Sequence, residues 1–218
     1  MTGDPDRRPL ASRDTGWARW IARRLTAAGI APNHISMASM VMAACAGVAF
    51  WQAGEAEAGA RIVLLIAAAL FCQLRLLCNL FDGMVAIEGG RQSPDGAFWN
   101  EFPDRVADML ILVGAGYGTG EPALGWAAAA FAVLTAYTRE LGRACGLPAD
   151  FRGPMAKPHR MATITAAALI SCVEPAWGGH GVILKAALWL IAAGAALTAL
   201  RRAATLVAAL RSRNGRTG

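Results

Sequence analysis

Long apolar segments alternate with short polar ones over most of the sequence. Six segments carry few charges, and most of them approach the roughly 20 residues that a helix needs to span a bilayer. They cover approximately residues 34–53, 61–82, 98–117, 122–142, 160–174 and 182–201. The third segment carries charged residues in its first half and the fifth is short, so hydropathy alone would count only four or five spans.

An amphipathic pattern precedes the first apolar segment. Its apolar positions recur at helical spacing, at Trp17, Trp20, Ile21, Leu25 and Ala28. A basic helix with aromatic anchors is typical of a helix that lies in the lipid headgroup plane, although the same pattern also fits a helix packed on protein. The preceding residues, 1–15, are polar and rich in Pro and Arg, and we expect them to be disordered.

The charges of the connecting segments favour six spans. If both termini lie in the cytoplasm, nearly all the arginines fall on the cytoplasmic side. The opposite loops hold Glu55, Glu57, Glu121 and Glu174, with Arg61 as the only basic residue near them. We therefore predict an all-α integral membrane protein of the cell membrane, with six transmembrane helices preceded by an N-terminal amphipathic interfacial helix. Residues 1–31 would form the tail and juxtamembrane helix, 32–202 the membrane domain, and 203–218 a basic cytoplasmic tail.

Composition agrees with this class of protein. Of the 218 residues, 56% are hydrophobic and 17% are charged, which is unlike a soluble domain. The formal net charge of +6 is explained by topology and anionic lipid headgroups, so we predict no nucleic-acid partner. Five scattered cysteines indicate neither a disulfide framework nor a zinc site, and we expect no cleavable signal peptide.

One polar stretch, residues 79–108, interrupts the apolar pattern. Asn79 and Asp82 stand three residues apart, and Asn100, Asp104 and Asp108 stand four apart, so each set shares a helix face. A carboxylate that stays charged at the bilayer centre costs roughly 2.5–3.5 kcal/mol, so these acids need a counter-charge. A divalent cation could supply it. The alternative is a structural network with arginines, for which Arg75, Arg105 and Arg139 are available.

The stretch resembles a known signature. The CDP-alcohol phosphatidyltransferases carry Asp-x-x-Asp-Gly-x-x-Ala-Arg, eight residues, Gly, three residues, Asp, three residues, Asp. Residues 79–104 agree with this spacing at every position, and the matching residues are Asp82, Gly83, Ala86, Gly96 and Asp104. Asn79 and Asn100 replace the first and third aspartates, and Ile87 replaces the arginine. Residues 31–36 also resemble the entry to the family's first membrane helix, and residues 153–160 resemble a loop of a bacterial branch.

The resemblance implies a phospholipid-synthesising transferase. Such enzymes move a phosphatidyl or other substituted phosphoryl group from a CDP-linked donor, such as CDP-diacylglycerol, to an alcohol, and release CMP. By resemblance, Asp104 is the catalytic base, and Mg²⁺ or Mn²⁺ is bound by Asn79, Asp82, Asn100 and Asp104. Asp108 lies one turn beyond Asp104 and is added to the metal set, because it would restore a charge. Glu101 is expected to face away from the site.

The remaining expected contacts fall into two groups. The nucleotide is expected at Pro32, Asn33, Asp82, Gly83, Ala86 and Gly96. An anionic acceptor or lipid phosphate is expected at Arg139, Arg143, Lys157 and Arg160. The expected partners are a CDP-linked lipid, a small or lipid alcohol acceptor that the basic cluster favours as an anion, membrane lipids and, from the resemblance alone, a second copy of the chain in a homodimer.

Three alternatives stay open. A shifted register would make Asp104 a metal ligand and Asp108 the base. The loss of two carboxylates would also fit a catalytically weakened or inactive relative that binds a nucleotide-lipid or a metal. A divalent-cation transporter is a more distant alternative, because the acids lie near one membrane face instead of along a path through the membrane.

Overall fold

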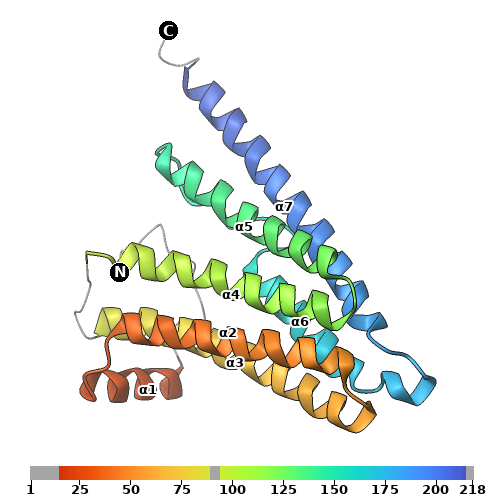
Figure 1. Ribbon diagram of the computed structural model, residues 1–218. Helices are drawn as coiled ribbons and strands as arrows, with labels where there is room; N and C mark the ends of the chain where they lie inside the picture. The colour runs from red at the N-terminus through yellow and green to blue at the C-terminus, as the bar shows by residue number, and fades with distance from the viewer. Residues whose placement is uncertain (1–14, 89–93, 215–218) are drawn as a thin grey trace.

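The structure is a computed structural model that describes residues 15–88 and 94–214 (Figure 1). Within these ranges the elements are α1 (Gly16–Ala27), α2 (Pro32–Glu55), α3 (Ala58–Glu88), α4 (Gly96–Gly118), α5 (Pro122–Ala144), α6 (Lys157–Ser171), the 3-10 turn η2 (Glu174–Trp177) and α7 (Val182–Asn214). The described residues form helices, turns and loops, which confirms the all-α class. The disorder predicted for residues 1–15 concerns residues that lie, except for Thr15, outside the described ranges.

Three of these helices are long and apolar enough to cross a membrane, namely α2, α3 and α7. The other three apolar segments coincide with α4, α5 and α6. The count of six spans therefore stays a prediction. α7 continues without a break to Asn214, so the first twelve residues of the expected tail 203–218 are helical.

The helices form two groups that diverge toward one end of the molecule (Figure 1). α2 packs against both α3 and α4, while α5 pairs with α7 and also contacts α4. α6 packs against α3 and α7 and so joins the two groups. α1 lies along α3, near the start of α2. The end of α3, which carries Asn79 and Asp82, therefore lies beside α1, and the start of α4, which carries Asn100 and Asp104, lies at the same end of the bundle.

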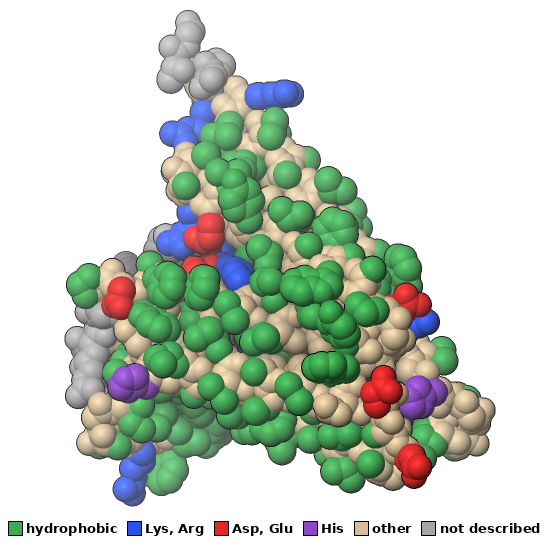
Figure 2. Space-filling view, viewed as in Figure 1, with side chains coloured by type: hydrophobic (Ala, Val, Ile, Leu, Met, Phe, Trp, Pro, Cys, Tyr) green, Lys and Arg blue, Asp and Glu red, His purple; other side chains and the backbone are tan. Residues whose placement is uncertain are grey.

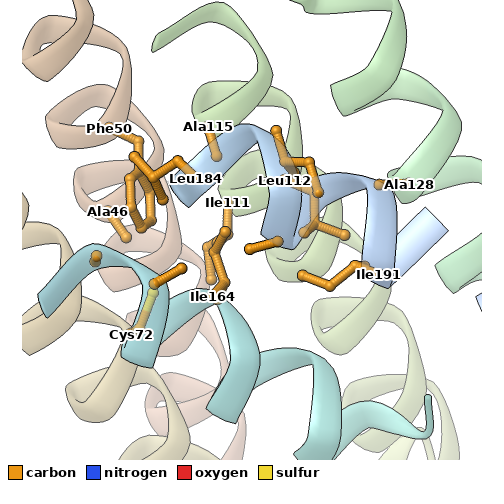
Figure 3. Close-up of a cluster of buried hydrophobic side chains, with 14 of the residues drawn as sticks. Ala46, Phe50, Cys72, Ile111, Leu112, Ala115, Ala128, Ile164, Leu184 and Ile191 are labelled. Carbon is orange, nitrogen blue, oxygen red and sulfur yellow. The ribbon is translucent and has the colours of Figure 1, made fainter. Parts of the chain in front are cut away.

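The core between these groups is built mainly from small and aliphatic side chains (Figure 3). Phe50 of α2, Ile111 and Leu112 of α4, and Leu184 and Ile191 of α7 are fully or almost fully buried. Alanines fill much of the remaining space and let the helices approach closely.

Glycine makes the closest of these approaches possible. A Cβ atom at Gly114 of α4 would collide with the backbone of Gly47 in α2, and one at Gly118 would collide with the backbone of Phe50. The two helices are thus in backbone contact, as is common where small residues mediate packing of membrane helices. This contact fixes the rotation of α4 about its axis, and with it the direction in which the acids of α4 point.

A buried ion pair secures the opposite end of the bundle. Arg61 Nη2 lies 2.9 Å from Glu174 Oε2, and both side chains are almost fully buried. Glu174 also accepts hydrogen bonds from the backbone N–H groups of Gly181 and Ile183, at 2.8 and 2.6 Å. The expectation that Arg61 is the only basic residue at this end was wrong, because Lys185 pairs with Glu121 at 2.9 Å.

We predict that Gly114→Ala lowers the thermal stability of the protein in detergent, by about 1–3 kcal/mol, because the added methyl group overpacks the contact between α2 and α4. Gly59→Ala is the matched control, since a Cβ atom there would meet no atom within 4 Å. It should leave stability unchanged or raise it slightly. Thermal unfolding followed by circular dichroism checks both variants, and equal midpoints for the two would contradict the close contact.

Candidate functional site

A cavity of about 550 Å³ opens where the two helix groups diverge. In Figure 2, acidic and basic side chains gather between α4 and α5 on a face that is otherwise largely hydrophobic. The expected site residues that line the cavity are Asn79, Asp82, Gly83, Asn100, Asp104, Arg139, Arg143, Lys157 and Arg160. Those that do not line it are Pro32, Asn33, Ala86, Gly96 and Asp108. The structure therefore brings the polar positions of the motif from α3 and α4 to one place.

Asp104 is the most heavily contacted acid of the cavity. Lys157, the first residue of α6, forms an ion pair through Nζ with Asp104 Oδ2. The other carboxylate oxygen, Oδ1, accepts hydrogen bonds from Asn79 Nδ2 and from Arg75 Nη2, the latter at 3.3 Å. Asp104 thus joins α3, α4 and α6, and its side chain keeps 13% exposure toward the cavity.

Asp82 has a different environment. Its Oδ2 accepts a hydrogen bond of 2.9 Å from Ser36 Oγ, near the start of α2. Pro32 is linked to the site through Ser36, since the Pro32 carbonyl oxygen lies 3.3 Å from the Ser36 hydroxyl oxygen. Asn33 instead donates to Asp95 Oδ2 at 3.4 Å, just before α4. The ion pairs found among the described residues do not involve Asp82, so its charge is left for a ligand.

Asp108 is buried beneath the cavity. Arg75 and Arg160 lie 3.1 and 2.6 Å from its two different oxygens, and its side chain is 2% exposed. Arg160 is itself buried and donates further hydrogen bonds to the Met155 carbonyl and the Thr135 hydroxyl. The structure therefore pairs Asp108 and Arg160 with each other, a geometry that does not favour the roles of metal ligand and acceptor contact predicted for them. The shifted register, with Asp108 as the base, does not fit this geometry.

Glu101 lines the cavity, so the expectation that it faces away was wrong. Its carboxylate is held by Arg105 and by Arg139 Nη2, the latter at 2.5 Å. The cavity is wide enough that positions about 100° apart on α4 both reach its wall. Arg139 also pairs with Glu140 at 2.8 Å and lies over the Phe151 ring. The alternative of an arginine network and the expected polar site are thus both present, side by side.

The sequence does not predict two further residues of the wall. Arg202, one of the arginines that the predicted topology assigns to the cytoplasmic side, lines the cavity and donates to the Thr135 and Arg152 carbonyls at 2.6 and 2.9 Å. Trp17, an aromatic anchor of the predicted interfacial helix, also forms part of the wall. Its ring packs edge-to-face on Phe81 with centroids 6.1 Å apart. Its place on the apolar face of the amphipathic helix was the signal that could have indicated this contact.

The loop between α5 and α6 forms another part of the wall, through Ala149, Phe151 and Ala156. Arg152 donates hydrogen bonds of 3.0 Å from both Nε and Nη2 to the Asp150 carboxylate. These bonds lower the pKa of Asp150 below its usual value, so this carboxylate is ionised at neutral pH. The pair stiffens the loop next to the cavity.

The oxygen donors of the cavity fit a hard divalent cation. Asp82 and Asp104 offer carboxylates, and Asn79 and Asn100 offer amide oxygens, which are ligands of the type that magnesium and manganese prefer. Over residues 15–88 and 94–214 there is no group of three or more His, Cys, Asp or Glu side chains arranged to hold a metal. The reason is that asparagine occupies two of the four positions, so the donor set carries only the two negative charges of Asp82 and Asp104.

Comparison with known proteins places this geometry in context. No family model matches the sequence. The chain is 26% identical over 200 residues to phosphatidylinositol phosphate synthase of Streptomyces avermitilis, which covers 88% of this chain and 77% of the relative. It is 31% identical over 140 residues to archaetidylinositol phosphate synthase of Aeropyrum pernix, covering 64% of this chain and 67% of the relative. A match to the bifunctional IPC transferase and DIPP synthase of Rubrobacter xylanophilus is 33% identical but covers only 27% of that protein.

Solved structures show the same fold. The crystal structure of Mycobacterium tuberculosis phosphatidylinositol phosphate synthase (PgsA1) in complex with manganese and citrate superposes with a TM-score of 0.72 at 20% identity, over 87% of this chain and 88% of that one. The same enzyme with CDP-DAG bound gives a TM-score of 0.71 at 19% identity, over 87% and 92% of the chains. Together with the archaeal relative and the intact spacing of the 79–104 motif, these matches show that the chain belongs to the CDP-alcohol phosphatidyltransferase family.

Proposed function

We propose that this protein is an integral membrane enzyme that transfers a phosphatidyl or related substituted phosphoryl group from a CDP-linked lipid to an alcohol in phospholipid synthesis. The observation that carries the proposal is the convergence of Asn79, Asp82, Gly83, Asn100 and Asp104 on one cavity with a basic opposite wall. Such a cavity can hold a diphosphate between oxygen ligands and cations. Family membership and the CDP-DAG bound to the structural neighbour support the donor class.

A divalent ion fits this site. Asp82 would hold it with the amide oxygens of Asn79 and Asn100, beside Asp104, and the manganese in the structural neighbour supports such an ion here. When bound, the ion would neutralise charge on the donor diphosphate and on departing CMP. We propose Mg²⁺ as the ion at work, with Mn²⁺ as a substitute, because both are hard cations that share oxygen ligands with phosphate.

The residues of the chain supply the remaining steps. The acceptor hydroxyl oxygen attacks the phosphorus that bears the lipid, the bond from this phosphorus to the CMP oxygen breaks, and CMP leaves. Asp104 accepts the hydroxyl proton, since its carboxylate lines the cavity, stands at the position of the motif's last aspartate and is held in place from three sides. Gly83 leaves room for the nucleotide to approach the end of α3.

The acceptor in this proposal is an anionic alcohol. Arg139 and Arg143 of α5 line the cavity, and guanidinium groups suit phosphate oxygens. Phosphatidylinositol phosphate synthase and archaetidylinositol phosphate synthase are the names of two relatives, so a cyclic polyol phosphate is the first acceptor to test. Arg160 is left out of this set because it is buried against Asp108.

The proposal includes the topology expected from the sequence. Six spans in the cell membrane, with the cavity and both termini in the cytoplasm, would place the basic end of the bundle on the cytoplasmic side. The cavity lies at the end of the molecule that carries α1 and most of the arginines, which supports this orientation. A homodimer is proposed from family resemblance alone.

The chief alternative is a relative that binds the nucleotide-lipid or metal without turnover. The observation in its favour is the donor set of only two carboxylates. Ile87, which stands at the arginine position of the motif, has an exposed side chain and does not line the cavity.

We predict that Asp104→Asn lowers the rate of CMP release by at least about 100-fold, because the acceptor loses its base. Asp82→Asn should raise the metal concentration needed for half-maximal activity. The assay follows CMP released from CDP-diacylglycerol by purified protein with Mg²⁺ or Mn²⁺ and a panel of alcohols. Glu121→Gln at the opposite end is the control and should behave as wild type. If no acceptor gives metal-dependent release of CMP, the result would favour the binding protein instead.

Asp108→Asn should reduce stability more than it reduces metal binding. The variant leaves the buried guanidinium groups of Arg75 and Arg160 without their shared carboxylate, a loss of about 3–5 kcal/mol. Thermal unfolding in detergent, compared with Asp104→Asn, checks this. A variant as stable as wild type that no longer binds Mn²⁺ would make Asp108 a metal ligand after all.

Arg143→Gln should raise KM for an anionic acceptor about tenfold with little change in kcat, because one charge-assisted contact is lost. KM for a neutral alcohol should not change. Arg201→Gln is the matched control, since Arg201 is an exposed arginine of α7 that does not line the cavity. Equal effects of Arg143→Gln on both acceptor classes would argue against an acceptor contact.

A further inference from the structure

Lysine is rare in this chain, and one lysine lies in the site. The 21 basic residues of the sequence include only Lys157 and Lys185. Lys185 is at the far end, paired with Glu121. Lys157 begins α6, lines the cavity and is ion-paired with Asp104 Oδ2. A chain that uses arginine almost everywhere else thus places a compact ammonium group at the carboxylate that faces the acceptor.

Asp82 and Asp104, the two carboxylates that the motif keeps, differ in how many cations lie next to them. Asp104 has a fixed cation on each oxygen, Lys157 on Oδ2 and Arg75 on Oδ1. Asp82 receives a hydrogen bond from the neutral Ser36 hydroxyl, and the ion pairs of the described residues leave it out. A divalent ion is therefore attracted to the Asp82 side of the cavity, and Lys157 repels a further ion from the Asp104 side.

We propose that Lys157 is a built-in cation at the Asp104 end of the cavity, so that the site works with one divalent ion held on the Asp82 side. This inference rests on the proposed function. An ammonium group has three N–H donors that rotate freely, so Lys157 can hold Asp104 and still donate to a phosphate oxygen of the donor. The planar guanidinium of arginine would fix these directions. Lys157 is thus a positioning residue for Asp104 and a substitute for metal charge.

The two missing carboxylates of the motif fit this arrangement. Asn79 and Asn100 contribute oxygen atoms to the cavity without negative charge. Five acids around the site, Asp82, Glu101, Asp104, Asp108 and Glu140, already lie among seven cations, Arg75, Arg105, Arg139, Arg143, Lys157, Arg160 and Arg202. The charge of one divalent ion is offset by a diphosphate, while a second ion would add to the positive excess at a membrane-embedded site.

The test counts bound Mn²⁺ by electron paramagnetic resonance on the purified full-length chain in detergent, with CDP present as the nucleotide. Wild type should bind one Mn²⁺ per chain. Lys157→Met keeps the length of the side chain and removes its charge, so Mn²⁺ should bind about tenfold more tightly or in a second equivalent. Lys157→Arg keeps the charge and should bind one. Lys185→Met, the same substitution at the other lysine, should match wild type.

The direction of the effect separates this role from a structural one. A residue that only supports the fold would, when lost, weaken Mn²⁺ binding together with the thermal midpoint, and that result for Lys157→Met overturns the proposal. Two Mn²⁺ per wild-type chain, or none, also overturns it, even if Lys157→Met does not fold. CMP release is measured separately on wild type, so that its absence contradicts the proposed function without altering the Mn²⁺ count.

Discussion

The pairing of Asp104 and Asp108 with cations from other helices is the constraint on which the site depends. Two carboxylates one turn apart on an apolar helix are costly unless each finds a partner. Arg75 of α3 reaches both of them, Lys157 and Arg160 of α6 reach one each, and so α3, α4 and α6 are held in one arrangement. Asp108 is buried by this pairing, while Asp104 still faces the cavity. One network therefore provides both the support of the site and its reactive group.

The contact between α2 and α4 makes this pairing possible from the other side. Backbone contact at Gly47 and Gly114 sets the rotation of α4, so that Asp104 and Asp108 point away from α2 and toward α3 and α6. At the far end, the pair of Arg61 and Glu174 ties the start of α3 to the turn before α7. The divergence of the helix groups is thus confined to the end that carries the cavity.

Much of this arrangement follows from residue spacing. The apolar segments predicted at 34–53 and 182–201 lie within α2 and α7, and the three- and four-residue spacings placed Asn79, Asp82, Asn100 and Asp104 on one cavity. Spacing shows which residues share a face of one helix. It does not show which neighbour covers that face or how wide the gap is. The sequence could therefore not separate Asp108, which is covered, from Asp104, which is open, and it missed Glu101 because the cavity is broader than a single helix face. The sequence did not identify Arg202 as a wall residue, because an arginine at the end of an apolar segment is equally consistent with a charge that only marks the cytoplasmic side.

Trp17 ties the first helix to the cavity in a way that amphipathicity alone does not require. The indole contributes to the cavity wall and packs on Phe81, one residue before Asp82. Another amphipathic helix of the same length and polarity would reproduce the exposed apolar face of α1 but would leave this wall incomplete. Trp17 and its position relative to α3 consequently help to determine the shape of the cavity. Exchanging α1 between relatives would therefore exchange part of the site and not only a membrane anchor.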